Sequence, residues 1–266
     1  HSESQDFISK NTCPVYLEKA EKRLREEELR LARYLDVSTE PKLITIVQRE
    51  LICNRAEVLV NMEHSGCVAM FKNEKLLDLQ RMYVLYKGVD SRSPSMKTLS
   101  YIQTALADHA YTSGQRLVTD EEKTKDPVAF VDAILKLRDR FEKIVSLSFE
   151  NDKKFERTLK ESFEKFINED SRCAQYLSLY VDDLLKSKLK GMSEGDVEEQ
   201  LGKVIVIFRY LQDKDVFENF YKEQLSKRML SGRSVSEDAE KSMISKLKKE
   251  CGYQFTQRLE GMFKDM

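Results

Sequence analysis

Only a few side chains in this sequence are of types that could do chemistry, and the histidines come first. Inside the chain there are two of them, His64 and His109. His109 lies three residues after Leu106 on an apolar stripe, which favours a packed histidine over a general base. His64 precedes Ser65-Gly66, where a protonated imidazole would suit the carboxyl end of a helix dipole. Neither histidine is predicted to be catalytic.

Cysteines and carboxylates offer no stronger candidate. Cys67 is three residues from His64, but a nucleophilic thiol needs a base in contact and a lowered pKa, so chance adjacency is preferred. Asp182 and Asp183 could bind a cation, yet neighbouring residues of a helix point about 100° apart, and we expect a solvated helix edge. None of the motifs HExxH, P-loop, GxGxxG and GxSxG occurs. The sequence therefore predicts no catalytic residue, no metal site and no cofactor.

Composition limits the partners and the compartment. The 45 basic and 46 acidic residues leave a net charge of −1, without the basic surplus of a nucleic-acid binder. No apolar run approaches the roughly 20 residues that span a bilayer. We therefore expect neither nucleic acid nor membrane as a partner. The cysteines form no CxxC pair, which favours reduced thiols in a protein of the cytoplasm and nucleus; they are Cys13, Cys53, Cys67, Cys173 and Cys251.

Apolar residues recur at helical spacing along nearly the whole chain. With only 9 glycines and 4 prolines, few tight turns are available. The pattern predicts about eleven helices joined by short polar links, and no strand. Residues 204–208 are rich in β-branched types, but they continue a helical period on both sides and are predicted to lie in a buried helix. Such a chain of amphipathic helices stacks as a bundle or a solenoid.

Local signals suggest where several of these helices begin. Residues 118–125 are polar and are predicted to form a loop. One apolar stripe runs from Ile44 to Met62, as if along a single helix. Start signals, either a proline in the first turn or a serine followed by an acidic residue, occur at Ser93-Pro94, Asp126-Pro127, Ser193 with Asp196, and Ser234 with Glu237.

The most informative stretch lies in the C-terminal third. Residues 213–230 read DKDVFENFYKEQLSKRML, which resembles the cullin pattern DKDVFxxFYKxxLAxRLL. Residues 234–248, SVSEDAEKSMISKLK, and residues 259–266, LEGMFKDM, follow in the cullin order and spacing. Looser likeness extends upstream to residues 16–21. Ser226 and Met229 depart from the usual alanine and leucine, and the chain is nevertheless identified as a member of the cullin family.

The same stretch can be read from its residue types alone. One broad apolar stripe must face neighbouring helices, and three basic residues, Lys222, Lys227 and Arg228, are expected around its edge. The motif is therefore predicted to seat one helix in a bundle and not to form a catalytic centre. The residues of the stripe are Phe217, Phe220, Tyr221 and Leu225.

The resemblance implies an all-α fold, a cullin-repeat solenoid in an elongated stalk followed by the start of a four-helix bundle. Residues 1–62 would end the second repeat, 63–170 would form the third, and 171–266 would open the bundle. The implied function is that of a non-catalytic scaffold in a multisubunit cullin-RING E3 ubiquitin ligase. The RING subunit, the substrate adaptor and the ubiquitin-like modifier NEDD8 would bind outside this chain. An E2 enzyme and cullin regulators are further candidate partners.

One surface of the chain has two interpretations. Lys186, Lys188 and Lys190 lie at the end of a predicted helix before Gly191, where they complement the helix dipole. In some cullins a basic patch at the corresponding place attracts the acidic tail of an E2 enzyme, and the resemblance implies that these lysines could do the same. Such attraction would raise the encounter rate more than the affinity.

Two other classes of protein are weighed against the scaffold. A generic helical-solenoid adaptor with peptide grooves would have no reason to contain the run at residues 213–266. An enzyme of unrecognised type would need a polar pocket that the sequence does not show. The resemblance also implies that the bundle is completed beyond Met266, so we expect the apolar face of the last helix to be unusually exposed, and that of the first helix more weakly so. These residues are Leu259, Met262 and Phe263, and Leu17, Leu24 and Leu31.

Overall fold

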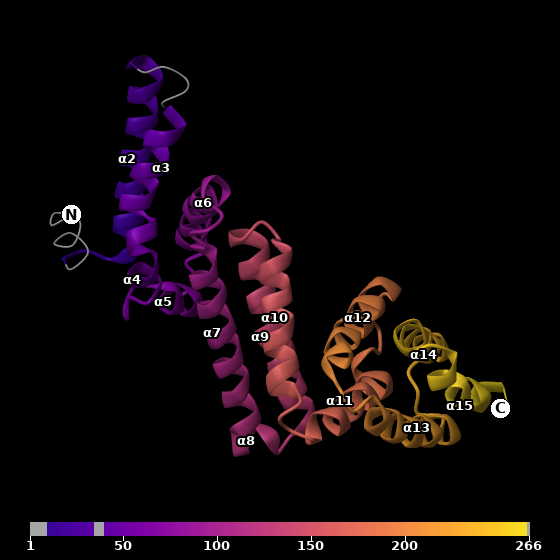
Figure 1. The fold of residues 1–266 in the computed structure, drawn as a ribbon. Coiled ribbons are helices and arrows are strands. Elements are labelled where there is room, and N and C mark those ends of the chain that lie inside the picture. Colours follow the sequence, from indigo (N-terminus) through magenta and orange to yellow (C-terminus); the bar gives the residue numbers. More distant parts are fainter. Residues whose placement is uncertain (1–9, 35–39, 265–266) are drawn as a thin grey trace. The chain divides into compact units, whose positions relative to one another are not determined.

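The computed structural model describes residues 10–34 and 40–264, and the regular structure in these ranges is helical, without a strand (Figure 1). The all-α prediction is therefore confirmed. The run at residues 204–208 lies inside helix α12 (Glu194–Tyr210), as its helical period indicated.

The chain forms two compact units, residues 1–110 with 140–161 and residues 111–139 with 162–266. It passes from one unit to the other within α7, α9 and α10. The predicted division into repeats at residues 62 and 170 stays a prediction. The elements that begin in the first unit are α2 Cys13–Tyr34, α3 Glu40–Leu51, η1 Cys53–Arg55, α4 Ala56–Val60, α5 Cys67–Lys72, α6 Leu76–Arg92, α7 Leu99–Thr119 and α10 Lys153–Ile167. Those that begin in the second are α8 Glu121–Thr124, α9 Pro127–Ser148, α11 Arg172–Asp183, η2 Leu184–Lys188, α12, α13 Lys214–Ser231, α14 Glu237–Cys251 and α15 Tyr253–Lys264.

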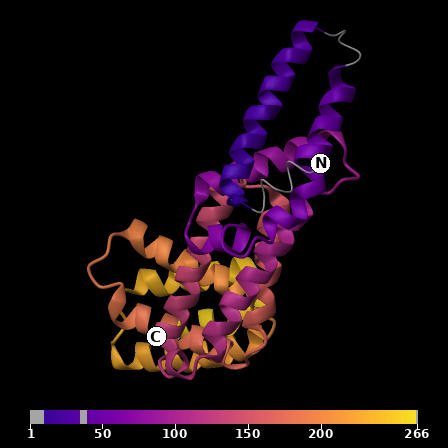
Figure 2. The ribbon, with the colours of Figure 1, turned by 90° about the vertical axis from the view of Figure 1, so that its left-hand side faces the viewer.

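In the first unit α2 and α3 lie side by side (Figure 1, Figure 2), and α6 contacts both. The leucine stripe of α2 is buried, with exposed fractions of 0% for Leu17, 6% for Leu24 and 7% for Leu31. The expectation that these three leucines are exposed is wrong, because packing against α3 and α6 buries this stripe of α2.

The apolar stripe from Ile44 to Met62 does not form one helix. It is broken after Leu51 into α3, the 3₁₀ turn η1 and the short helix α4. Tyrosines from neighbouring helices satisfy carbonyls around the break: Tyr16 donates to the carbonyl of Leu51 at 2.8 Å, and Tyr86 to that of Ala56 at 3.0 Å. The break therefore leaves these backbone acceptors paired, which removes the main cost of interrupting a helix.

Aromatic rings fill the core of the first unit. The Phe149 ring lies 4.5 Å from Phe155 and 5.6 Å from Tyr83, measured between ring centroids. His109 stacks on Phe71 at 5.8 Å and meets Phe141 edge-on at 5.6 Å. His109 is thus a packed histidine, as predicted.

In the second unit α13 packs along α11, α12 contacts α11 and α14, and α15 contacts α13 and α14 (Figure 1). Leu259 on α15 is fully buried between these helices, so the expectation that it is exposed is wrong. Met262 and Phe263 are half-buried. The bundle is built on side chains with no exposed surface, among them Leu201, Val204, Phe208, Phe217, Tyr221, Leu225, Met243 and Leu247.

Two of the predicted helix starts are confirmed. Asp126 accepts from the backbone N–H of Val128 at 2.9 Å and so caps α9. Ser193 accepts from the N–H of Asp196 at 3.2 Å and caps α12.

The remaining boundary predictions are wrong. The cap of α14 is Ser236, because the hydroxyl of Ser234 donates to Glu240 at 3.0 Å and is not available to the helix. Helix α7 begins at Leu99, five residues beyond Pro94, where Asp90 accepts from the N–H of Leu99 at 3.0 Å. The predicted loop at residues 118–125 contains the end of α7 and the short helix α8.

Substitution by alanine should have opposite effects on stability at two glycines inside helices of the second unit. A Cβ at Gly114 in α7 would lie 2.2 Å from the ring of Phe166, whereas one at Gly202 in α12 would meet nothing within 4 Å. We expect Gly114→Ala to lower the free energy of unfolding, since overpacking costs about 1–3 kcal/mol. Gly202→Ala should raise it by about 0.5–1 kcal/mol through helix propensity. Urea denaturation measures both; a stabilising Gly114→Ala would contradict the close packing of α7 on α10.

Candidate functional site

Helix α13, which carries the cullin-like run, is seated by one apolar face. Phe217, Tyr221 and Leu225 follow each other at four-residue steps and have no exposed surface. The ring of Phe217 stacks on that of Tyr221 at 5.7 Å and meets Phe208 of α12 at 5.0 Å. Phe220 lies to one side of this face and is only half-buried.

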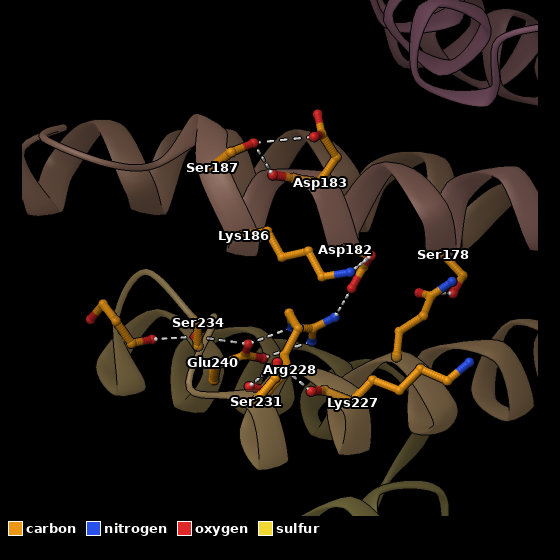
Figure 3. A network of polar contacts seen from close by, with 12 residues as sticks. Ser178, Asp182, Asp183, Lys186, Ser187, Lys227, Arg228, Ser231, Ser234 and Glu240 are labelled. Carbon is orange, nitrogen blue, oxygen red and sulfur yellow. Dashed lines mark hydrogen bonds and ion pairs between the residues drawn. The ribbon is translucent and has the colours of Figure 1, made fainter.

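Arg228 ends the same face, and its position corrects the sequence-based prediction. We expected it at the edge of the stripe, but its side chain has an exposed fraction of 0%. Its guanidinium donates through Nε to Glu240 Oε1 at 2.7 Å and through Nη2 to Glu240 Oε2 at 2.9 Å. Through Nη1 it donates to Asp182 Oδ1 at 2.6 Å. Figure 3 shows Arg228 between the two carboxylates, so that one side chain of α13 joins α11 and α14.

We call Arg228, Glu240 and Asp182 the clamp. Two further side chains contact the clamp: Lys186 pairs with Asp182 Oδ2, the one carboxylate oxygen that Arg228 does not use, at 2.5 Å, and Ser234 donates to Glu240 Oε1 at 3.0 Å (Figure 3). Asp182 is therefore not part of a solvated edge, since only 13% of its side chain is exposed. A buried charge is tolerated only when it is paired and hydrogen-bonded in this way.

Burial and the paired charges act oppositely on the pKa of Arg228. Burial alone would lower the pKa, but the hydrogen bonds to Glu240 raise it above the ordinary arginine value. The guanidinium therefore keeps its charge in this buried position. Burial, followed by the charge of Glu240, raises the pKa of the neighbouring Tyr221 hydroxyl.

The sequence carried a signal for the clamp that our interpretation missed. Arg228 lies three residues after Leu225 and seven after Tyr221, on the buried side of α13. Glu240 lies three residues before Met243 and seven before Leu247, on the buried side of α14. Two opposite charges on the inner faces of consecutive helices indicate a buried ion pair.

The three lysines at the end of α11 do not present three free charges. A π-helical turn, η2, follows α11, and the N–H of Leu189 donates to the carbonyl of Leu184 at 3.1 Å. Lys186 is engaged with the clamp, while Lys188 lies 3.4 Å from Asp183 and 3.5 Å from Asp132. Lys190 is exposed and forms no ion pair with any residue that the structure describes. The role of the three toward an acidic partner stays a prediction.

The cysteine and the histidine considered from the sequence, Cys67 and His64, lie in different environments. Cys67 is fully buried with Sγ 3.4 Å from Met82 Sδ, and burial raises the pKa of its thiol well above the ordinary value. The side chain of His64 is 91% exposed in the turn between α4 and α5. Across residues 10–34 and 40–264 no three histidine, cysteine or acidic side chains gather where they could hold a metal ion. No helix in the same ranges is long and apolar enough to cross a membrane.

Removing only the arginine of the clamp should destabilise the protein strongly, whereas removing the arginine together with Glu240 should not. Arg228→Met leaves Glu240 buried without a counter-charge, so we expect the free energy of unfolding to fall by about 3–5 kcal/mol. Adding Glu240→Leu removes the uncompensated charge, while Asp182 keeps Lys186. The double variant should therefore recover most of the loss, as read from urea denaturation.

A matched control is the exposed interhelical pair of Arg209 and Glu250, which joins α12 to α14 at 2.5 Å with 53% of the arginine side chain exposed. Arg209→Met should cost no more than about 1 kcal/mol, as surface pairs do. An Arg228→Met variant no less stable than Arg209→Met would show that the clamp is not buried.

Comparison with known proteins gives one consistent family. The chain matches the family model described as the cullin alpha solenoid domain over residues 1–266. It is 50% identical to Cullin-3A of Arabidopsis thaliana over 264 residues, which cover 99% of this chain and 35% of that protein. It is 43% identical to Cullin-3 of Dictyostelium discoideum over 265 residues (100% and 34%) and 37% identical to Cullin-4A of Homo sapiens over 266 residues (100% and 34%). The chain thus spans about a third of the length of these relatives.

Proposed function

This chain belongs to the cullin family, and we propose that it forms part of the non-catalytic scaffold of a cullin-RING ubiquitin ligase. The observation that carries the proposal is α13. Its sequence follows the cullin pattern, and its buried face and Arg228 tie α11 and α14 into one packed body. The generic solenoid adaptor is set aside, because the family match extends over the whole chain.

A scaffold of this kind acts through geometry and not through reacting groups. Its task is to keep the bound subunits at positions from which ubiquitin can reach a substrate, and this requires segments that do not deform. Buried side chains and a buried ion pair resist deformation because any shift would open voids or separate charges. The RING subunit, the substrate adaptor and NEDD8 would bind the full-length protein outside this chain.

Purification of the full-length protein from its source tests the proposal. We expect a RING subunit and a substrate adaptor to co-purify with it. Ubiquitin transfer from a charged E2 enzyme should require that complex, and the 266-residue chain alone should not discharge the E2. Failure of any RING subunit to co-purify, with substrate ubiquitination unchanged when the protein is depleted, would contradict the scaffold role.

We also propose that Lys190 supplies most of any attraction of this segment for an acidic E2 tail. Lys186 and Lys188 already lie beside Asp182, Asp183 and Asp132, so their charges are largely offset. The charge of Lys190 is therefore the one that remains available to an acidic partner.

Charge reversal in the full-length ligase distinguishes the contributions of the three lysines to ubiquitin transfer. Lys190→Glu should slow ubiquitin transfer at low salt, with the difference shrinking as ionic strength rises. Lys188→Glu should have a smaller kinetic effect, whereas Lys186→Glu should lower stability because it places a second carboxylate beside Asp182. Rates for Lys190→Glu that equal the wild-type rates at every ionic strength would leave only the helix-dipole role for these lysines.

A further inference from the structure

A hollow of about 510 Å³ opens in the second unit beyond the end of η2, between the first turns of α12 and α14. Ligand pockets in proteins commonly have volumes of about 300–1,000 Å³, so there is room for one or two side chains of a partner. The lysines of η2 are not among its lining residues, and the hollow has no part in the scaffold role proposed above.

The walls of the hollow are held in place by contacts already described. The N–H of Val235 donates to the carbonyl of Leu185 at 2.8 Å, which fixes the loop before α14 against the π-helical turn. Glu240, one turn into α14, is anchored by Arg228 (Figure 3). The clamp and this backbone hydrogen bond therefore hold two sides of the hollow in place.

The lining of the hollow is apolar at its base and partly exposed at its mouth. Leu189 and Ala239 are buried, with exposed fractions of 2% and 5%. Met192 is 44% exposed, and Val197 and Val235 are half-exposed. Adjacent apolar side chains left in contact with water gain free energy when a partner covers them.

The charges around the hollow are negative. Glu194, Glu198 and Asp238 line it, and no lysine or arginine of the described chain does. Glu198 is held by Lys246 at 2.6 Å and by the hydroxyl of Ser242. Glu194 and Asp238 form no ion pair with a residue that the structure describes. Two exposed carboxylates thus remain to meet a cation.

Helix dipoles account for part of this arrangement. Glu194 and Asp238 lie in the first turns of α12 and α14, where negative charge is favourable. That effect explains the carboxylates, but it does not explain why a hollow with buried apolar side chains at its base lies between them, beside the exposed Met192. The combination favours an occupant that is apolar and positively charged.

We propose that the hollow is a docking site for a short segment of a partner protein, in which an aliphatic side chain enters the hollow and a neighbouring lysine or arginine meets Glu194 and Asp238. Electrostatic complementarity of this kind selects basic over acidic segments. The docking site does not depend on the scaffold role, so the two can fail separately.

Fluorescence anisotropy with labelled peptides tests the site on the 266-residue chain. The probe is a hexapeptide of sequence Gly-Leu-Arg-Leu-Arg-Gly; the controls replace its arginines with glutamates or its leucines with serines. We expect the probe to bind with a dissociation constant of about 10–500 μM, in the range of weak peptide contacts, and both controls to bind at least about tenfold more weakly.

Variants locate the binding. Glu194→Gln with Asp238→Asn should weaken binding of the probe about tenfold and flatten its salt dependence. Met192→Ser should weaken it about fivefold, as expected for loss of part of one apolar side chain. The matched control, Glu199→Gln with Glu237→Gln, removes two charges from the same two helices outside the hollow, where they pair with Lys203 and Lys241. It should leave binding unchanged.

Four results would overturn the proposal. The first is a dissociation constant above about 1 mM for the probe and the unsubstituted chain, which corresponds to a binding free energy weaker than about 4 kcal/mol. The second is equal binding of the acidic peptide, and the third is equal weakening by the matched control. Self-association of the chain that Met192→Ser abolishes would also overturn it, since a second copy would then be the occupant.

Discussion

The second unit depends on one constraint: Arg228 has no contact with water and cannot lose its proton. A charged guanidinium in that position needs carboxylates around it, and the fold brings one from α11 and one from α14. The neighbouring apolar side chains would tolerate small shifts, but the ion pair would not, because its energy depends steeply on distance in a buried environment. Close to this ion pair, the loop before α14 is bonded to η2 through Val235 and Leu185.

A second principle recurs in both units, namely that side chains from other helices pair the backbone groups at helix ends. In the first unit the hydroxyls of Tyr16 and Tyr86 donate to backbone carbonyls around the break after α3. In the second, Asn168 donates to the carbonyl of Tyr210 at 2.8 Å and accepts from the N–H of Gln212 at 2.8 Å, where α12 ends. Each such bond ties one helix end to another element, so the polar groups of the chain are used for structure.

The sequence predicted the helices well because their existence depends on local spacing. One helix face carries Leu201, Val204 and Phe208, and it is apolar whichever neighbouring helix covers it. The caps Asp126 and Ser193 accept from N–H groups only two and three residues further along the chain. Features that depend on distant residues were missed. The sequence predicts Arg228 at the edge of the stripe because a long basic side chain at the border of an apolar stripe usually reaches water. Its partner Asp182 is 46 residues away. The sequence predicts Ser234 as a cap because nothing local shows that its hydroxyl donates to Glu240 instead.

The buried Arg228 joins α11, α13 and α14 so that they move as one body. The most direct test is the rate at which the Nε–H proton of Arg228 exchanges with solvent, measured by nuclear magnetic resonance and compared with that of Arg157, whose side chain is 80% exposed. We expect the Arg228 proton to exchange only through global unfolding, with a free energy of opening close to the free energy of unfolding of the chain. An Arg228 proton that exchanges as fast as that of Arg157 would contradict it.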